Sequence, residues 1–257
     1  MKKKTQSNIK NIVIAILVVI IATLLYHYTK KAPAPAKETA PAAPAPVPAA
    51  TPISISEKDI KEDNFTGKQP VITGSAEIAT AARAYIDKTV GDFRTQANAD
   101  VPDMRAKFGA DSPPATYTIE IEAKYQKGGK TDSIILTGYA YTGGANGNSS
   151  YKVFTASHAT GKMITLSDAI KSDQQAAFTA FVKKKLIAWR PQGSDTNVVF
   201  ADAVGDLNFS SFDSWSMDSK NLTIYFDKYE IGPGVLGAVP FLIPLTELDT
   251  YLAAPYK

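Results

Sequence analysis

The chain has 257 residues, with 28 basic and 25 acidic side chains, two His and no Cys. The lack of Cys excludes disulfides, thiolate zinc sites and Cys nucleophiles, and two His exclude a multi-His metal centre. Residues 1–52 carry a net charge of +6 and residues 53–257 carry −3, so the part that can fold lacks the basic face that nucleic-acid binding needs.

The N-terminal segment has the pattern of a membrane anchor. Four Lys precede an apolar run at 12–28, which is short for a spanning helix and also fits a signal peptide. Pro35 follows the Ala-x-Ala sequence at 32–34 and disfavours cleavage there, so we expect an uncleaved anchor. The Lys bias predicts a cytoplasmic stub at 1–11, with the bulk of the chain extracytoplasmic at a bacterial cell membrane.

A linker rich in Pro and Ala follows at 29–52. Its last 21 residues hold seven Pro and nine Ala, a composition that cannot form a core and favours polyproline II. Such a segment reaches about 65 Å if it is fully extended. It is either a stalk that lifts the following domain off the membrane or a simple tether.

The first half of the domain at 53–257 shows one helix and three strands. Apolar residues at spacings of three and four predict a helix over 74–96, with Ser75 as its N-cap. Alternating residues predict a strand at 115–126, and the glycines at 128–129 predict a hairpin to a strand at 132–142. A glycine-rich turn at 143–148 leads to a third strand at 150–158.

The second half reads as one main helix and further strands. The spacing predicts a helix over 173–189, ended by Pro191, then strands at 212–217, 222–226 and 239–243 and a short helix at 245–252. Because strands and helices do not alternate regularly, we predict an α+β fold, with antiparallel sheet or sheets packed with two main helices. The break at 112–114 allows two lobes, 53–112 and 113–257.

Several residues suggest chemistry, and each also has a plain structural interpretation. The turn at 143–148 could offer backbone N–H groups to an anion or only form a hairpin connection. His158 lacks the Gly-x-Ser-x-Gly motif of a serine hydrolase. Four carboxylates could act on glycosides, but such residues also cap turns and helices; they are Asp227, Glu230, Glu247 and Asp249.

Aromatic residues gather around the motif strands. Aromatic rings with polar tips suit carbohydrate or protein recognition, and they equally suit half-buried sheet positions. The loop at 229–234, rich in Gly and Pro, is the best candidate for a contact loop. The tyrosines concerned are Tyr139, Tyr141, Tyr151, Tyr225 and Tyr229.

Three ordered motifs carry a resemblance to a known family. They are the Tyr-x-Tyr-x-Gly-Gly-Ala-Asn-Gly segment at 139–147, the Thr-Gly-Lys turn at 160–162 with a Leu-x-Asp step at 166–168, and the segments 227–233 and 241–244. From about residue 69 to residue 252, the chain resembles the extracytoplasmic C-terminal domain of the anti-sigma factor RsiV, which senses lysozyme. The same domain of unknown function accompanies the peptidoglycan deacetylase PdaC.

The chain also departs from that family. Asn146 stands where the motif carries His, and the eleven residues before the apolar run are too few to hold a sigma factor. The deacetylase domain of PdaC, with its metal ligands, has no counterpart here. The resemblance therefore implies the binding or sensing module alone, without a segment that holds a sigma factor and without a deacetylase domain.

The expected function is a single-pass, membrane-anchored module of the cell envelope that binds lysozyme, a similar protein or peptidoglycan. The alternatives are a peptidoglycan-active enzyme and a structural or assembly protein. We expect no catalytic residue, metal, cofactor or nucleic acid. The expected ligand-binding residues are Tyr139, Tyr141, Gly143, Gly144, Asn146, Tyr229 and Glu230.

Overall fold

The computed structural model describes residues 51–109, 116–191, 193 and 195–257. Residues Ala49–Lys257 form one compact unit. The predicted anchor at 12–28 and nearly all of the linker lie outside the described residues. Within the described ranges, no helix is both long enough and apolar enough to cross a membrane.

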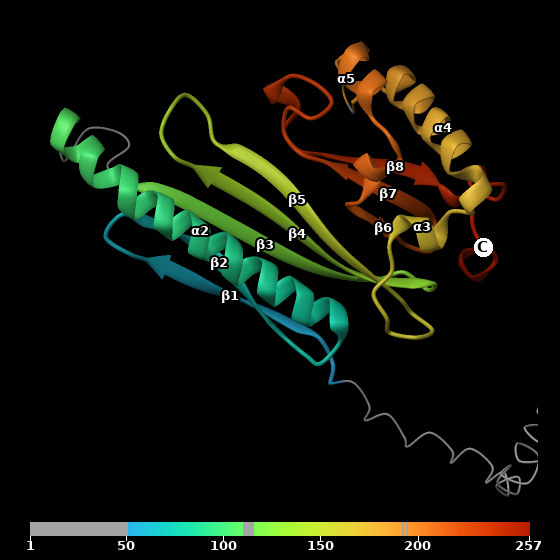
Figure 1. Cartoon of the computed structure of the whole chain (residues 1–257), viewed down its shortest axis with the longest axis horizontal. Helices are drawn as coiled ribbons and strands as arrows, with labels where there is room; N and C mark the ends of the chain where they lie inside the picture. The colour runs from blue at the N-terminus through green and yellow to red at the C-terminus, as the bar shows by residue number, and fades with distance from the viewer. Residues whose placement is uncertain (1–50, 110–115, 192, 194) are drawn as a thin grey trace, which may run out of the picture. The chain divides into compact units, whose positions relative to one another are not determined.

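The first lobe is a five-stranded sheet covered on one face by a long helix (Figure 1). The strands follow chain order, and every neighbouring pair is antiparallel except β2 and β3. The helix α2, Glu77–Phe108, connects that parallel pair. The strands are β1 (Ser54–Lys61), β2 (Phe65–Thr73), β3 (Tyr117–Lys127), β4 (Thr131–Tyr141) and β5 (Asn148–Ser157).

The apolar stripe that predicted the first helix is the face that α2 buries. Its buried positions recur every three or four residues from Ile78 to Val101. The helix is longer than predicted, because Ala97 and Val101 extend the buried stripe and the helix continues through Pro102 to Phe108. Ser75 is not the N-cap: Ala76 takes that place, and the Ser75 hydroxyl accepts a hydrogen bond from Thr51 N.

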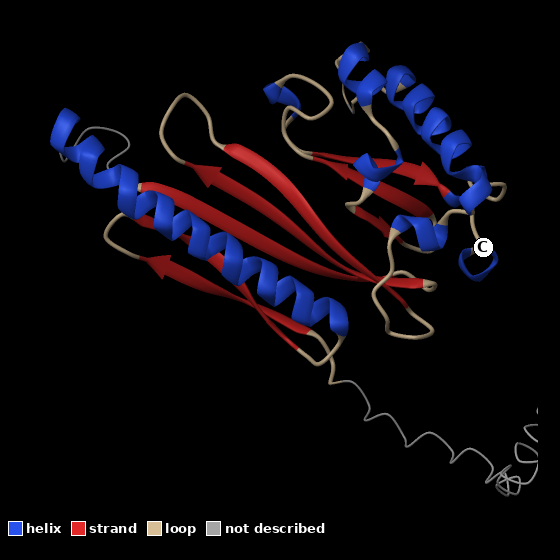
Figure 2. Cartoon of the chain, in the orientation of Figure 1, coloured by secondary structure: helices blue, strands red, loops and turns tan. Residues whose placement is uncertain are grey.

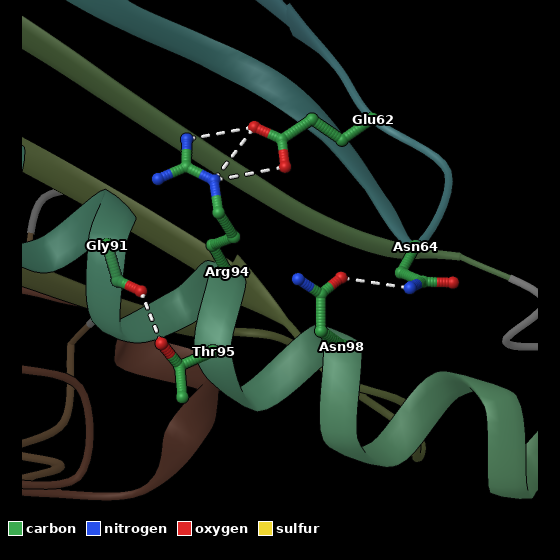
Figure 3. A network of polar contacts seen from close by, with 6 residues as sticks. All are labelled: Glu62, Asn64, Gly91, Arg94, Thr95 and Asn98. Carbon is green, nitrogen blue, oxygen red and sulfur yellow. Dashed lines mark hydrogen bonds and ion pairs between the residues drawn. The ribbon is translucent and has the colours of Figure 1, made fainter.

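Side chains of α2 hold the turn between β1 and β2 (Figure 3). The Arg94 guanidinium donates to both carboxylate oxygens of Glu62, at 2.8–3.0 Å. One turn further on, Asn64 Nδ2 donates to Asn98 Oδ1 at 2.9 Å. These contacts attach the β1–β2 hairpin to α2. The sequence pattern predicted the helix but not the hairpin.

The second lobe is a three-stranded antiparallel sheet surrounded by short helices (Figure 2). Its strands are β6 (Trp215–Met217), β7 (Asn221–Phe226) and β8 (Val239–Pro244). Its helices are α3 (Leu166–Ala169), α4 (Gln175–Ala188) and α5 (Ala201–Asp206). Together with the first lobe this confirms the α+β class, with one parallel strand pair that was not predicted.

Two elements of the second lobe differ from the sequence prediction. The segment 245–252 contains a single 3-10 turn, Leu245–Glu247, instead of a helix. The strand predicted from residue 212 begins only at Trp215, because Phe209–Phe212 form a 3-10 turn. That turn buries Phe212 against Phe178 of α4, with the two rings edge to face at 6.1 Å.

The two lobes meet through buried polar contacts. On β4 and β5 the side chains alternate, so that Ile134 and Leu136 face α2 while Ile135 and Val153 face the second lobe. Thr155 Oγ1 donates to Trp215 O at 2.6 Å. The buried core of the first lobe ends in β5, and that of the second lobe begins in α3. A boundary at 112 therefore does not separate the two cores.

Candidate functional site

The glycine-rich loop between β4 and β5 folds back on its own tyrosines. Gly143 and Gly144 have φ of 89° and 106°, a conformation that glycine adopts without strain. The Tyr141 hydroxyl donates to Gly144 O at 3.0 Å. The Tyr139 ring lies so close to Gly147 that a Cβ there would be 2.4 Å from it. The glycines therefore allow the loop to pack against two tyrosines.

A second loop, residues 227–237, is attached to this first one by its opening residues. Asp227 Oδ1 accepts a hydrogen bond from Tyr151 N at 2.7 Å, and Lys228 N donates to Ser149 O at 3.0 Å. Lys228 Nζ also donates to Gly147 O at 2.6 Å. The two loops are 81 residues apart in sequence at this contact, yet they form one surface.

Tyr229 has the only positive φ, 72°, among the described residues other than glycine. Its side chain is 58% exposed, and Val235 on the same loop is 90% exposed. The Tyr229 ring lies against Gly234, and Lys228 Nζ is 4.9 Å from its centroid. These contacts fix an aromatic ring at the surface despite the strained backbone.

Between the two loops lies a crevice of about 360 Å³. Tyrosine rings, a side-chain amide and an ammonium group line it, so it offers apolar faces together with a few hydrogen-bonding groups. Its lining comprises Tyr139, Tyr141, Ala145, Asn146, Gly147, Ser149, Lys228 and residues 234–237.

The structure brings most of the predicted binding residues to this crevice in different roles. Tyr139, Tyr141 and Asn146 line it. Gly143 and Gly144 shape the loop beside it, and Tyr229 stands on the adjoining loop. Glu230 does not line the crevice, because its carboxylate turns back to accept a hydrogen bond from Asp227 N at 2.7 Å.

Burial raises the pKa of the Glu230 carboxyl, and the neighbouring Asp227 and Asp213 carboxylates raise it further, while the hydrogen bond from Asp227 N lowers it. Burial also raises the pKa of the phenols of Tyr151 and Tyr225, whose rings lie 4.9 Å apart beside the seam between the lobes. Both tyrosines therefore stay neutral near neutral pH and serve as packing groups.

The other chemical candidates have structural partners. Glu247 pairs with Lys185 at 2.6 Å, and Asp249 pairs with Lys257 at 3.1 Å, both away from the crevice. His158 Nδ1 lies 2.9 Å from Asp132 Oδ2. In the described part of the chain, no three His, Asp or Glu side chains gather closely enough to hold a metal ion.

Sequence reasoning missed two contributors to the site. Lys228 joins the loops, and Val235 is the most exposed large apolar side chain described. The contact loop had been predicted only to residue 234. No local pattern marks Lys228, since its acceptor belongs to a distant loop.

The chain is similar to several known proteins. The family model "Protein of unknown function (DUF3298)" matches residues 166–246, so a DUF3298 domain is present there. The peptidoglycan-N-acetylmuramic acid deacetylase PdaC of Bacillus subtilis is 24% identical over 205 residues. That match covers 77% of this chain and only 41% of PdaC.

Two solved structures share the fold. A DUF3298 family member from Bacteroides fragilis has a TM-score of 0.55 at 16% identity, covering 79% of this chain and 94% of that one. A DUF3298 family protein from Pseudomonas aeruginosa has a TM-score of 0.51 at 18% identity, covering 80% and 95%. The matches extend over both lobes of the fold.

Proposed function

We propose that this protein is a membrane-anchored, extracytoplasmic binding module of the RsiV type, with no catalytic role of its own. Its N-terminus is cytoplasmic, and its stalk carries the two-lobed domain outside the cell membrane. Its partner is a lysozyme-like protein that acts on the cell wall. The crevice and the loop at 227–237 form the contact surface.

The exposure of Tyr229 and Val235 is the observation that carries this proposal. Both side chains project from a loop whose first residues make hydrogen bonds to β5 and to the glycine-rich loop. A partner that covers them buries an aromatic and an aliphatic group. Because the loop is already held in place, it loses little conformational freedom on binding. Tyrosine anchors of this kind commonly dominate protein–protein affinity.

The charge of the domain supports a cationic partner. Residues 53–257 carry a net charge of −3. Such a charge favours encounter with a basic protein, and the effect weakens as salt is added. Lysozyme-like proteins therefore fit the proposal better than acidic ones.

Cell-wall glycan is the second candidate partner. PdaC, which is named for its action on peptidoglycan, matches most of this chain. The crevice presents tyrosine faces beside the Asn146 side chain, a combination that suits sugar rings and their hydroxyls. A peptidoglycan-active enzyme and an envelope assembly protein remain alternatives for the same domain.

A binding titration tests the proposal. The full chain in detergent micelles is titrated by calorimetry with hen lysozyme and, separately, with soluble peptidoglycan fragments. Tyr229→Asn removes the ring with a residue that tolerates positive φ, and Val235→Ser removes the other anchor. Each change is expected to weaken lysozyme binding by about tenfold or more.

Leu242→Ser is the matched control, because Leu242 is 56% exposed on β8 and lies outside the crevice. Its affinity should equal that of the unchanged protein. If only the fragments bind, the partner is cell-wall glycan and not a lysozyme-like protein. If the fragments are cleaved, the protein is a peptidoglycan-active enzyme. An absence of binding to both would refute the proposed function.

A further inference from the structure

The edge of strand β5 is incompletely paired. β5 is the last strand of the five-stranded sheet and lies next to the second lobe in Figure 1. One of its edges bonds to β4 along its whole length. In an antiparallel pair, alternate residues turn their backbone N–H and C=O groups away from the neighbouring strand. On β5 the outward groups belong to the odd-numbered residues.

Loops cover both ends of this outer edge. At the start of β5, Ser149 O accepts from Lys228 N, and Tyr151 N donates to Asp227 Oδ1. At its end, Thr155 O accepts from Ile164 N, and Ser157 N donates to Lys162 O. All four bonds involve odd-numbered residues of β5, which confirms the direction of the outer groups.

The middle of the edge makes no hydrogen bond to the part of the chain that the structure describes. Among the described residues, no hydrogen bond reaches Tyr151 O, Val153 N, Val153 O or Thr155 N. Val153 is only 6% exposed and Thr155 only 3%. Backbone groups in such surroundings are normally paired, since an unpaired one loses its water without a replacement. The edge therefore has donors and acceptors available for another backbone.

An apolar groove of about 400 Å³ adjoins this open stretch. Residues 152–155 of β5 line it together with residues 163–167 and the segment that leads into β6. The apolar side chains of its lining include Phe154, Met163, Ile164, Leu166, Phe209 and Trp215. The charges at the groove, Lys152 and Asp213, pair with one another at 3.7 Å, so a neutral side chain suits it best.

We propose that this edge and groove bind an extended peptide segment of another protein by adding a short strand to β5. The segment pairs its backbone with Tyr151, Val153 and Thr155 and places one apolar side chain in the groove. The main-chain bonds supply affinity and the groove supplies specificity, as in other cases of strand addition. This site is separate from the crevice and does not depend on the proposed function.

The covered ends limit the occupant to a short segment. The open stretch from Tyr151 to Thr155 spans four residue steps, or about 13 Å. An extended segment of three to five residues can satisfy its four free groups in either direction. The β5 strand of a second copy is a poor occupant, because the loops at 162–164 and 227–228 would meet its longer edge.

The experiment uses the full chain in detergent micelles and a panel of blocked heptapeptides that alternate Thr with Val, Leu, Ile, Phe or Tyr. Binding is followed by tryptophan fluorescence, to which Trp215 at the groove contributes, and by amide hydrogen exchange. We expect at least one peptide to bind saturably and to slow exchange at Val153 and Thr155. Two further versions of this peptide are N-methylated at either of two adjacent central amides. Because alternate amides of an added strand face β5, one of the two should bind at least about tenfold more weakly, since it has lost a main-chain donor to β5.

Protein variants separate the groove from other surfaces. Met163→Asp puts a charge at the groove on an exposed residue and should weaken binding of the best peptide by about tenfold or more. Leu242→Asp changes another exposed apolar residue, on β8, and should leave binding unchanged. The proposal is overturned if no peptide binds, if N-methylation weakens binding at neither of the two adjacent amides, or if exchange at Val153 and Thr155 stays the same.

Discussion

The two lobes reach stability by different means. The first lobe uses long, regular elements, with a 32-residue helix packed on a sheet whose side chains alternate. The second lobe uses short elements around an aromatic cluster, in which Phe178 meets the rings of Phe209, Phe212 and Tyr251. Long elements carry their own periodic pattern, whereas short ones depend on tertiary contacts.

Both lobes contribute to the crevice that is the candidate binding surface. The family model matches only the second lobe and the loop at 227–237, but that loop is held by β5 and by the glycine-rich loop of the first lobe. A module defined by the second lobe alone would lack one wall of the crevice. Whether the lobes unfold together is therefore the first question to test.

Phe178→Ala is expected to have the largest effect. Phe178 is fully buried, and its removal from the aromatic cluster should lower the free energy of unfolding by about 3–5 kcal/mol. Urea unfolding is followed by tryptophan fluorescence, which reports the second lobe through Trp189 and Trp215, and by far-UV circular dichroism, to which α2 contributes strongly.

Because buried hydrogen bonds join the lobes, the two signals should shift together. Phe65→Ala in the core of the first lobe is the matched variant, and Phe65 is equally buried. In this variant too, the fluorescence and circular dichroism transitions should shift together. Separate midpoints for fluorescence and dichroism in either variant would mean that the lobes unfold independently.

Gly128→Ala tests the seam between the lobes directly. A Cβ at this position would lie 1.9 Å from Met217 O, a backbone atom that cannot move without shifting β6. We expect the free energy of unfolding, measured with urea, to fall by about 1–3 kcal/mol. Gly129→Ala is the control, since a Cβ there meets nothing within 4 Å and only its φ of 82° causes strain. A smaller loss at 128 than at 129 would contradict the close approach.

Gly91→Ala should stabilise the first lobe. Gly91 lies inside α2, and a Cβ at this position meets nothing within 4 Å. Alanine restricts the conformations of the unfolded chain, so it should raise the free energy of unfolding by about 0.5–1 kcal/mol. The Gly91 carbonyl would still accept from the Thr95 hydroxyl, as drawn in Figure 3. Thermal unfolding gives the change, and an unchanged or lower midpoint would argue against an open site.

Glu230→Gln should have the smallest effect, visible as a change in pH dependence. Burial raises the pKa of Glu230 above its ordinary 4.5, so the folded state binds the proton more tightly. This contribution to stability is complete below pH 4.5 and is lost as the pH rises through the folded-state pKa. Glutamine keeps an acceptor for Asp227 N but does not titrate.

The variant should therefore lose less stability than the unchanged protein between about pH 4 and about pH 7. Urea midpoints at several pH values across this range measure the difference. Parallel curves for the two proteins would mean that the Glu230 carboxyl has the same pKa folded and unfolded.

The limits of sequence reasoning follow from how each element is buried. The strand β3 was predicted because its side chains alternate between apolar and polar, and β4 and β5 were predicted from the glycine-rich turns that precede them. The strand β1 has only Ile60 buried, so it shows no apolar pattern, and Pro70 within β2 argues locally against a strand. Because β2 was missed, the parallel crossover through α2 was missed as well.

The candidate site was predicted in two separate pieces. The tyrosines at 139 and 141 and the loop from 229 stood out as motifs, but nothing local shows that they adjoin. Their proximity depends on Lys228, which bonds to Gly147 O and Ser149 O. The groove beside β5 is built from three distant segments and leaves no sequence signal.

The sequence by itself determined the charge division, the exclusion of cysteine and multi-histidine chemistry, and the long elements whose period of two or 3.6 residues exposes one face to a core. Only the tertiary structure decided how the lobes meet, which loops share a crevice and which stretch of β5 stays open. The physical reason is range: periodicity is a property of neighbouring residues, whereas a hydrogen bond such as that from Thr155 to Trp215 O forms only once both lobes are in place.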